Sequence, residues 1–539
     1  MDYSTGKLLF IFIPAVLLAL LSAAWLARRY RSTMRRLMSA PRAGGTQDAA
    51  SSSAAPHAHA QANLPLADAL PVSARDNRRA GLRLALLLVG LSALLALSTA
   101  ALLLHVVMDD MAFSLRRLLV LGLAYLWPVI PALALLWRWS RWRLIGTMLL
   151  WFVLSYFVLL AQAIAPDPAQ TLAFLGFAIG PALLIVGAVC MGGATRAIAP
   201  WLLLPMIGLV WASMSGIDVI AQVVDDPPGW FIALAESIGA YPTMGLFALA
   251  PWLIAWWPLK RRGRWLAQAY TRKWLSELMV LFTATWGIVP TIEAIAHASS
   301  MGLAGIVMCL PLAWVPVVML PLLHRSRRPA AGRAPTLLVL WVFQRDARIQ
   351  ALFDDVVERW RLSGNTVLIA GTDLVERTLG ADDIFALIDG RLDTRFIRRP
   401  ADVSERLAEF DLAPDAEGRY RINECYCRDS TWQAALDALV QRSDVVLMDL
   451  RSFKSHNEGC RHELGVLARA PRLARIVVPT DGDTDRGAAQ SAVAGVPAGR
   501  FVWLDTARID RAKRREVLAR LLLDQECGIP ASGGQPHRA

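Results

Sequence analysis

Residues that bind metals or form disulfides are scarce in this chain, which has 6 cysteines and 8 histidines among 539 residues. Cys425 and Cys427 are one residue apart, but no second Cys or His pair stands at the spacing of a zinc site. His57 and His59 lie in a low-complexity stretch without further ligands nearby. We therefore expect no metal, no resident cofactor, and free thiols in a reducing compartment.

The sequence also lacks the interleaved basic and aromatic pattern that is typical of nucleic-acid-binding proteins. Lys and Arg number 56 against 44 Asp and Glu, which gives a net charge of +12. The basic clusters stand at the ends of apolar runs, as they do in membrane proteins whose orientation they determine. We therefore expect these basic residues to interact with the lipid bilayer and not with nucleic acid.

The N-terminus lacks the pattern of a cleavable secretory signal. Its apolar run covers residues 8–26, and the basic cluster at 28–31 follows that run instead of preceding it. This order predicts a membrane anchor helix within residues 1–38, with the N-terminus outside. Residues 39–76 are partly of low complexity and cannot bury a core, which predicts a disordered linker.

Long apolar runs, by contrast, are abundant: the chain is 55% hydrophobic and its mean hydropathy is +0.41. A helix crosses a bilayer with about 20 apolar residues, and residues 77–328 contain several such runs. Together with the anchor they predict a polytopic helical bundle of about nine spans in the inner membrane, with the C-terminal part in the cytoplasm. The predicted spans lie near residues 8–26, 83–105, 117–137, 144–164, 171–191, 199–221, 238–257, 275–296 and 302–323.

Ionisable residues within these spans are few, and Asp218, Glu277 and Glu293 lie toward span ends. Transporters usually place such groups at mid-depth and break helices around them. An anchoring or sensory membrane part is therefore favoured, and a transporter with a regulatory domain stays open as an alternative. Residues 230–240 are amphipathic, so this segment either crosses the membrane or lies in its outer interface.

Residues 335–525 alternate strand and helix patterns, and residues 526–539 are expected to form a disordered tail. Apolar strands that alternate with helices predict an α/β domain with a five-stranded parallel sheet covered on both faces. Gly364 is expected to end the first helix. The predicted strands cover 336–343, 366–370, 444–450, 475–479 and 501–504, and the predicted helices cover 347–362, 431–441, 458–469 and 512–523.

Three blocks of this domain resemble the Toll/interleukin-1 receptor (TIR) family. Residues 340–353 resemble its opening strand, loop and first helix, and residues 435–447 resemble the helix and strand before its signature loop. Residues 459–464, Gly-Cys-Arg-His-Glu-Leu, resemble the Trp-Cys-x-x-Glu-Leu motif, with Gly459 in place of the tryptophan. The segment 374–428 has no counterpart in these blocks. The resemblance implies a flavodoxin-like fold and does not extend to the membrane part.

The resemblance also implies an activity, because catalytic TIR domains cleave NAD at the nicotinamide–ribose bond. The matching carboxylate is Glu463, which would stabilise the positive charge that develops on the ribose during cleavage. Cationic groups would bind the diphosphate, and side chains that follow parallel strands lie where open α/β sheets bind ligands. The residues expected to bind the nucleotide are Phe343, Arg345, Arg348, Asp373, Asp449 and Arg451.

Other interpretations of the same residues stay open. Glu463 would have only a structural role if it is an early-helix acid that favours the helix dipole, and Cys460 has the spacing of a core residue. TIR domains also act as assembly modules, so the loop 452–457 is a candidate docking surface and a homo-oligomer is expected. The leading hypothesis is a signalling or defence protein that binds a nucleotide, and the alternative is a non-catalytic interaction module.

Overall fold

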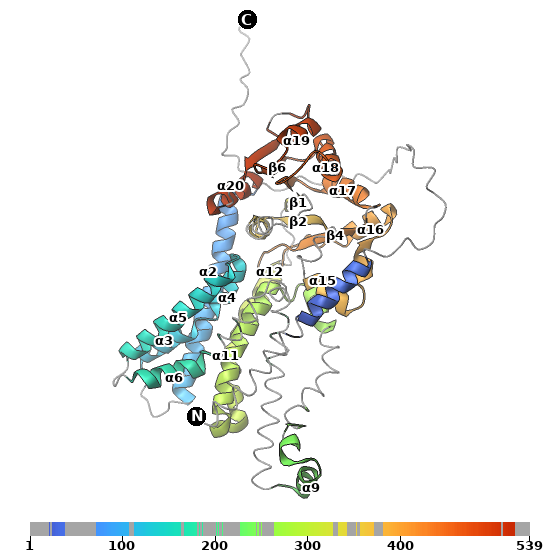
Figure 1. The fold of residues 1–539 in the computed structure, drawn as a ribbon. Coiled ribbons are helices and arrows are strands. Elements are labelled where there is room, and N and C mark those ends of the chain that lie inside the picture. Colours follow the sequence, from blue (N-terminus) through green and yellow to red (C-terminus); the bar gives the residue numbers. More distant parts are fainter. Residues whose placement is uncertain are drawn as a thin grey trace. The chain divides into compact units, whose positions relative to one another are not determined.

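The chain forms two compact units in a computed structural model (Figure 1). Unit 1 contains Met1–Ser32, Leu84–Arg327 and Arg377–Leu392, and unit 2 contains Thr33–Arg83, Arg328–Glu376 and Asp393–Ala539. The structure describes residues 72–106, 113–162, 167–180, 227–243, 264–326, 332–341, 356–370, 381–428, 430–497, 499–507 and 510–522, with shorter pieces such as 24–37.

Apolar helices make up unit 1, and in the described part of the chain three helical stretches are long and apolar enough to cross a membrane. These are α2 (Ala74–Val106), α5 (Arg141–Gln162) and Gly305–Leu322, which runs from η1 (Gly302–Ala313) into α12 (Trp314–Ser326). A fourth span results if α3 (Leu115–Tyr125) and α4 (Val129–Leu136) count as one, although they are bent by 46°.

The described residues therefore hold three or four candidate spans instead of the nine that the sequence predicts. The predicted spans at 8–26, 199–221 and 238–257 lie largely outside the described residues. Within 117–137 the helix breaks before Pro128, because proline lacks a backbone N–H and clashes with the preceding turn. The amphipathic segment forms α9 (Gly229–Ile238), whose 10 residues are too few to cross a bilayer.

One helix from the C-terminal half of the sequence belongs to unit 1. This helix, α15 (Ala381–Ile388), lies in the segment 374–428 that has no counterpart in the TIR-like blocks. Its Phe385 packs against Trp201 and Tyr270, with ring centroids 5.0 and 5.5 Å apart. The segment thus contributes a helix to the apolar packing of unit 1.

Unit 2 contains a parallel sheet of seven strands, in the order β3-β4-β2-β1-β5-β6-β7. The predicted number of five strands is wrong, because two further strands form within the segment 374–428. The five predicted strands stand among themselves in the order 2-1-3-4-5, which is the flavodoxin-like order. The strands are β1 (Thr336–Trp341), β2 (Asn365–Ala370), β3 (Phe396–Ile397), β4 (Ile422–Cys427), β5 (Val445–Asp449), β6 (Arg475–Thr480) and β7 (Phe501–Asp505).

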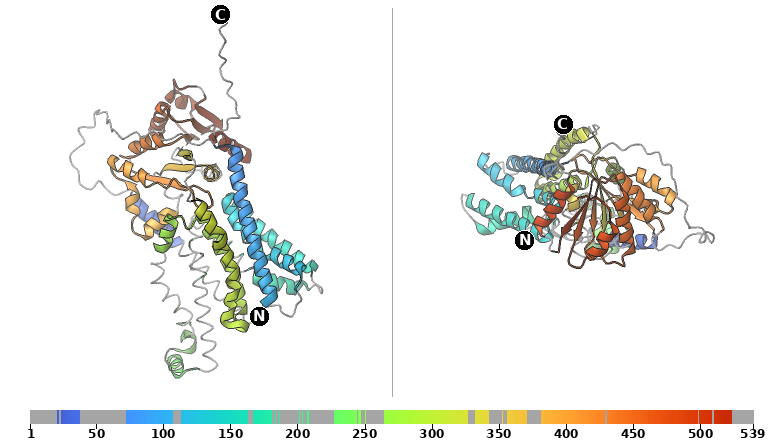
Figure 2. Two further views of the ribbon diagram at one scale, coloured as in Figure 1. Left: turned by 180° about the vertical axis from the view of Figure 1, so that it is seen from behind. Right: turned by 90° about the horizontal axis from the view of Figure 1, so that it is seen from above.

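Helices cover both faces of this sheet (Figures 1 and 2). Side chains alternate between the faces of a strand, and Leu340, Met448 and Val478 point to the face that packs on α17 (Trp432–Arg442), α18 (Glu458–Arg469) and α19 (Arg486–Ala492). α20 (Arg511–Leu521) contacts β5 and β6 and buries its own Val517 and Leu521. The predicted helices at 431–441, 458–469 and 512–523 are confirmed within a few residues.

A close approach of two backbone segments fixes the entry to β2. The short helix α14 (Glu358–Trp360) is the described end of the predicted helix 347–362, and its C-cap is Arg361 and not Gly364, which was expected to end the helix. A Cβ atom at Gly364 would lie 2.2 Å from the carbonyl oxygen of Pro335. The N–H of Asn365 donates to that same oxygen at 2.9 Å. Glycine is therefore required here by space, and this contact sets the register of β1 with β2.

Candidate functional site

The carboxyl edge of the sheet contains a topological switch point between β1 and β5. The chain continues from β1 to β2 on one side, whereas β5 leads to β6 on the other side. The last paired residues of the two neighbouring strands are Trp341 and Asp449. Open α/β sheets bind ligands outside the carboxyl ends of their strands at such a point. The side chains at the ends of β5 and β6 are therefore the first candidates for function.

Arg451 and Asp449 form a buried ion pair at the end of β5. The Nε atom of Arg451 donates to Oδ1 of Asp449 at 2.8 Å, and Nη2 donates to Oδ2 at 2.5 Å. The exposed fractions of the two side chains are 4% and 5%. The third guanidinium nitrogen, Nη1, is buried and has no hydrogen-bond partner among the described residues. Because a buried donor without a partner is unfavourable, this nitrogen is a candidate ligand contact.

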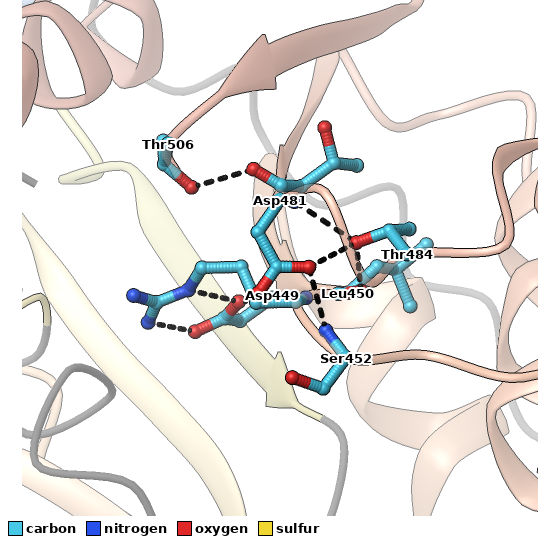
Figure 3. A network of polar contacts seen from close by, with 8 residues as sticks. Asp449, Leu450, Ser452, Asp481, Thr484 and Thr506 are labelled. Atoms are coloured by element: carbon cyan, nitrogen blue, oxygen red, sulfur yellow. Dashed lines mark hydrogen bonds and ion pairs between the residues drawn. The ribbon is translucent and has the colours of Figure 1, made fainter. Parts of the chain in front are cut away.

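A second acid, Asp481, follows β6 and orders the loop that comes after β5 (Figure 3). Its Oδ1 accepts hydrogen bonds from the Ser452 backbone N–H at 3.0 Å and from the Thr484 hydroxyl at 2.8 Å. Burial opposes the charged form, but these hydrogen bonds and the charge of Arg451 outweigh it, so the pKa of Asp481 lies below its usual range. Asp481 is therefore an ionised acceptor at this edge.

The loop after β5 is held in a specific backbone conformation. Ser452 has a φ of 61°, in the left-handed region that L residues rarely adopt. The Thr484 hydroxyl lies 2.9 Å from the Leu450 carbonyl oxygen and accepts from the Asp481 N–H at 2.9 Å, so it ties the two loops together. The Thr506 hydroxyl donates to the Thr480 carbonyl oxygen at 2.9 Å, which joins the end of β7 to the same edge (Figure 3).

Glu463 lies in the middle of α18 and not in the loops of the carboxyl edge. It is 5% exposed, and its neighbours along the inner face of the helix are Cys460, Leu464 and Leu467, all core residues. Its Oε2 atom has no hydrogen-bond partner among the described residues, and burial raises its pKa to about 8. A carboxyl group in this environment is mostly neutral at pH 7.

Cys460 is a buried thiol, as its spacing predicts. Burial, together with the nearby charge of Glu463, raises its pKa to about 12. A thiol that stays protonated at neutral pH is a poor nucleophile. Cys460 therefore contributes packing to the core and is not a candidate for covalent catalysis.

The structure brings together only part of the residues expected to bind the nucleotide. Asp449 and Arg451 lie in contact at the switch point. Phe343, Arg345, Arg348 and Asp373 lie outside the described residues; in the sequence they follow β1 and β2, which end at the same edge.

Sequence reasoning missed the acid and the hydroxyls that follow β6. Residues 480–484, Thr-Asp-Gly-Asp-Thr, come directly after a predicted strand, as Asp449 and Arg451 do in the case of β5. The same rule, that polar residues at strand ends are site candidates, would have found Asp481 and Thr484.

The edge therefore combines carboxylate acceptors with a guanidinium nitrogen, Nη1 of Arg451, that has no hydrogen-bond partner among the described residues. Carboxylates such as those of Asp449 and Asp481 accept hydrogen bonds from ribose hydroxyls, and a guanidinium nitrogen donates to phosphate oxygens. Among the described residues no group of three or more His, Cys, Asp or Glu side chains has the geometry of a metal site. Comparison with known proteins found no matching family, no similar curated protein and no similar solved structure.

Proposed function

We propose that this chain is a membrane-anchored, TIR-like signalling or defence protein whose C-terminal α/β domain binds a nucleotide. The apolar helices of unit 1 support the anchor. The strand order of unit 2, which is flavodoxin-like for the five predicted strands, is compatible with a TIR-like domain. The distribution of basic clusters supports an inner-membrane location, with the N-terminus outside and unit 2 in the cytoplasm.

The unpartnered Nη1 of Arg451 is the observation that carries the nucleotide assignment. Asp449 accepts from the other two nitrogens of this guanidinium, so the group is held in one orientation, and its buried Nη1 would gain a partner from an anionic oxygen. A diphosphate supplies such oxygens, and its ribose supplies hydroxyl groups for Asp481. Arg345 and Arg348, which follow β1 in the sequence, would add positive charge.

Titration of the full-length chain in lipid nanodiscs with NAD and with ADP, followed by calorimetry, tests this proposal. Arg451→Lys keeps the charge but removes the forked donors, and we expect roughly tenfold weaker binding. Arg515→Lys, at an exposed position of α20, is the matched control and should bind like the wild type. A wild-type chain that binds neither nucleotide, or a lysine variant that binds as well as the wild type, would contradict the proposal.

Cleavage of the bound NAD is the enzymatic part of the proposal. The resemblance gives the charge-stabilising role to Glu463, and because this residue is buried in α18, the role requires that α18 expose it to the nucleotide. Because burial raises the pKa of Glu463 to about 8, the carboxylate form becomes abundant only in mildly alkaline solution. Release of nicotinamide should therefore increase as the pH approaches about 8, and Glu463→Gln should abolish it. Glu458→Gln, at an exposed position of the first turn of α18, is the control. If the chain binds NAD but releases no nicotinamide at any pH, the cleavage part of the proposal is wrong and the binding part remains.

The alternative is a non-catalytic interaction module, and the structure changes the surface that it would use. Phe453 is fully buried, so its predicted place in a docking loop is wrong: this apolar side chain packs into the core beneath the loop. Lys454, Ser455 and His456 are exposed instead. Ser455→Trp should then weaken self-association of the full-length chain without changing its thermal stability, as read by analytical ultracentrifugation in detergent.

A further inference from the structure

Unit 1 holds a buried acid against a break in a helix. Glu293 lies in α11 (Glu277–Met301), shortly after Pro290, and is 4% exposed. Its Oε1 accepts a hydrogen bond from the Tyr125 hydroxyl at 2.5 Å. Tyr125 is the last residue of α3, directly before the bend that separates α3 from α4. The acid therefore lies against the middle of this bent pair, whereas its place in the sequence suggests the end of a span.

A second polar group stands in the same break. Trp127 is fully buried, and its Nε1 donor has no hydrogen-bond partner among the described residues. Pro128 follows it and supplies no backbone N–H. The break thus places the Tyr125 hydroxyl and the Trp127 indole N–H in the apolar interior of unit 1. The Tyr125 hydroxyl is hydrogen-bonded to the carboxyl group of Glu293.

Polar and ionisable groups inside a membrane are unfavourable and usually mark a functional site. Broken helices at mid-depth mark the binding sites of many membrane proteins. A purely structural role is poorly suited to Glu293, because an apolar residue would pack this interior without the desolvation of a carboxyl group. A buried acid, a hydrogen-bonded phenol and a helix break together indicate a site for a ligand that a carboxyl group can bind and release.

We propose that Glu293 and Tyr125, at the break between α3 and α4, form a proton-binding site inside unit 1. A proton requires neither a cavity nor a shell of ligands, and the direct contact of the two oxygen atoms leaves no space for a metal ion between them. On release, the neutral carboxylic acid of Glu293 gives a carboxylate and one proton, and binding reverses this step. The Tyr125 hydroxyl donates to Oε1 of Glu293 and fixes the position of this carboxyl group.

Few other ionisable groups stand on the described elements that pack on α11. The sequences of α4 and α6 (Pro168–Ala178) contain none, and η1 contains Cys309. Within α11 itself the others are Glu277, in the first turn, and His297, one turn beyond Glu293. α2 contributes Ser92 to Trp286 of α11, and its ionisable residues lie toward its two ends. The remaining charges of α3 are Arg116 and Arg117, in its first turn. The contact of Glu293 that concerns the proposal is the Tyr125 hydroxyl, 2.5 Å from its Oε1.

Labelling with dicyclohexylcarbodiimide tests the proposal, because this apolar reagent modifies protonated carboxylic acids in membrane interiors. The full-length chain in nanodiscs is treated at a series of pH values, and the modified peptide is identified by mass spectrometry. We expect labelling of Glu293 that falls severalfold as the pH rises. Glu293→Gln should remove this label and thereby confirm its position.

Tyr125→Phe separates a proton site from a buried acid that merely reacts. Loss of the phenol donor should change the midpoint of labelling measurably, because Glu293 loses its contact with the Tyr125 hydroxyl. Tyr156→Phe, in α5, is the control and should leave the midpoint unchanged. Absence of labelling in the wild type, or labelling that does not depend on pH, would overturn the proposal even if the variants fail to fold. An unchanged midpoint in a folded Tyr125→Phe chain would overturn the role of Tyr125.

Discussion

The Nη2 atom of Arg451 lies 2.5 Å from Oδ2 of Asp449, at the place where neighbouring strands of the sheet lead in opposite directions. Two opposite charges are buried here together and are joined by two parallel hydrogen bonds from Nε and Nη2 of Arg451. Loss of one partner of such a pair is strongly unfavourable, because the other charge then stays buried without a partner. The pair therefore holds the guanidinium in one orientation, and its buried Nη1 has no hydrogen-bond partner among the described residues.

Removal of one partner of this pair should destabilise the protein strongly. Arg451→Gln leaves Asp449 buried and unpaired, and we expect a loss of about 3–5 kcal/mol in the free energy of unfolding. The double variant Arg451→Gln with Asp449→Asn should lose less than the single variant, because no lone charge remains. Chemical unfolding followed by circular dichroism measures both, and equal losses would show that the pair does not act as a unit.

Glu463 should make the stability of the protein fall as the pH rises. Its pKa is about 8 in the folded chain and about 4.5 for an unperturbed carboxyl, so the unfolded chain releases this proton first. The contribution is thus fully present below about pH 4.5 and is lost progressively up to about pH 8. Glu463→Gln, which stays neutral, should melt at a higher temperature than the wild type at pH 8 and at a similar temperature at pH 5. A difference that does not change with pH would contradict the burial of an ionisable group.

Gly364 should not tolerate a side chain. In Gly364→Ala the Cβ atom would meet the Pro335 carbonyl oxygen at 2.2 Å, so β1 and β2 would have to move apart. We expect a loss of several kcal/mol, at least about 2 kcal/mol. Gly459→Ala is the matched control, because nothing lies within 4 Å of its Cβ position in the first turn of α18, and it should stabilise the protein slightly. Thermal melting of both variants gives the comparison.

The Thr484 hydroxyl should affect both the stability of the protein and the pKa of Asp481. Thr484→Val keeps the shape but removes the contacts to Asp481 and to the Leu450 carbonyl oxygen, for an expected loss of about 1–3 kcal/mol. The pKa of Asp481 should rise at the same time, because a hydrogen bond to its charged form is lost. Ser491→Ala, at an exposed position of α19, is the control. Carboxyl titration by nuclear magnetic resonance and thermal melting together measure the two effects.

The sequence predicts the long apolar strands and misses two others: β3, which has only two residues, and β4, whose apolar pattern is interrupted. β1, β5 and β6 are runs of Leu, Val and Ile, and their predicted bounds agree with the structure within one or two residues. β4 contains Asn423 and Glu424, which break the apolar pattern. In the fold both are buried and paired: Asn423 bonds the backbone of residue 411, and Glu424 accepts from the Tyr426 hydroxyl. Pairing of this kind depends on residues that only the tertiary structure brings together.

In the candidate site, too, the sequence pattern predicts some features, whereas others depend on the tertiary structure. Asp449 and Arg451 could be placed at the edge of the sheet because they directly follow an apolar strand. Their mutual ion pair, and the single nitrogen that it leaves without a partner, depend on side-chain geometry that a pattern does not contain. The burial of Phe453 was missed for a related reason, because a single apolar residue in a polar loop gives no sign of whether it points inward.

The outer strands of the sheet restrict how copies of this protein could associate. β3 has two residues and so offers little backbone of its own for another chain to extend the sheet, while β7, at the opposite margin, has five. Short outer strands are a recognised protection against the ladder-like stacking that leads to fibrils. Association of copies should therefore rely on helices and loops instead of strand addition to β3 itself.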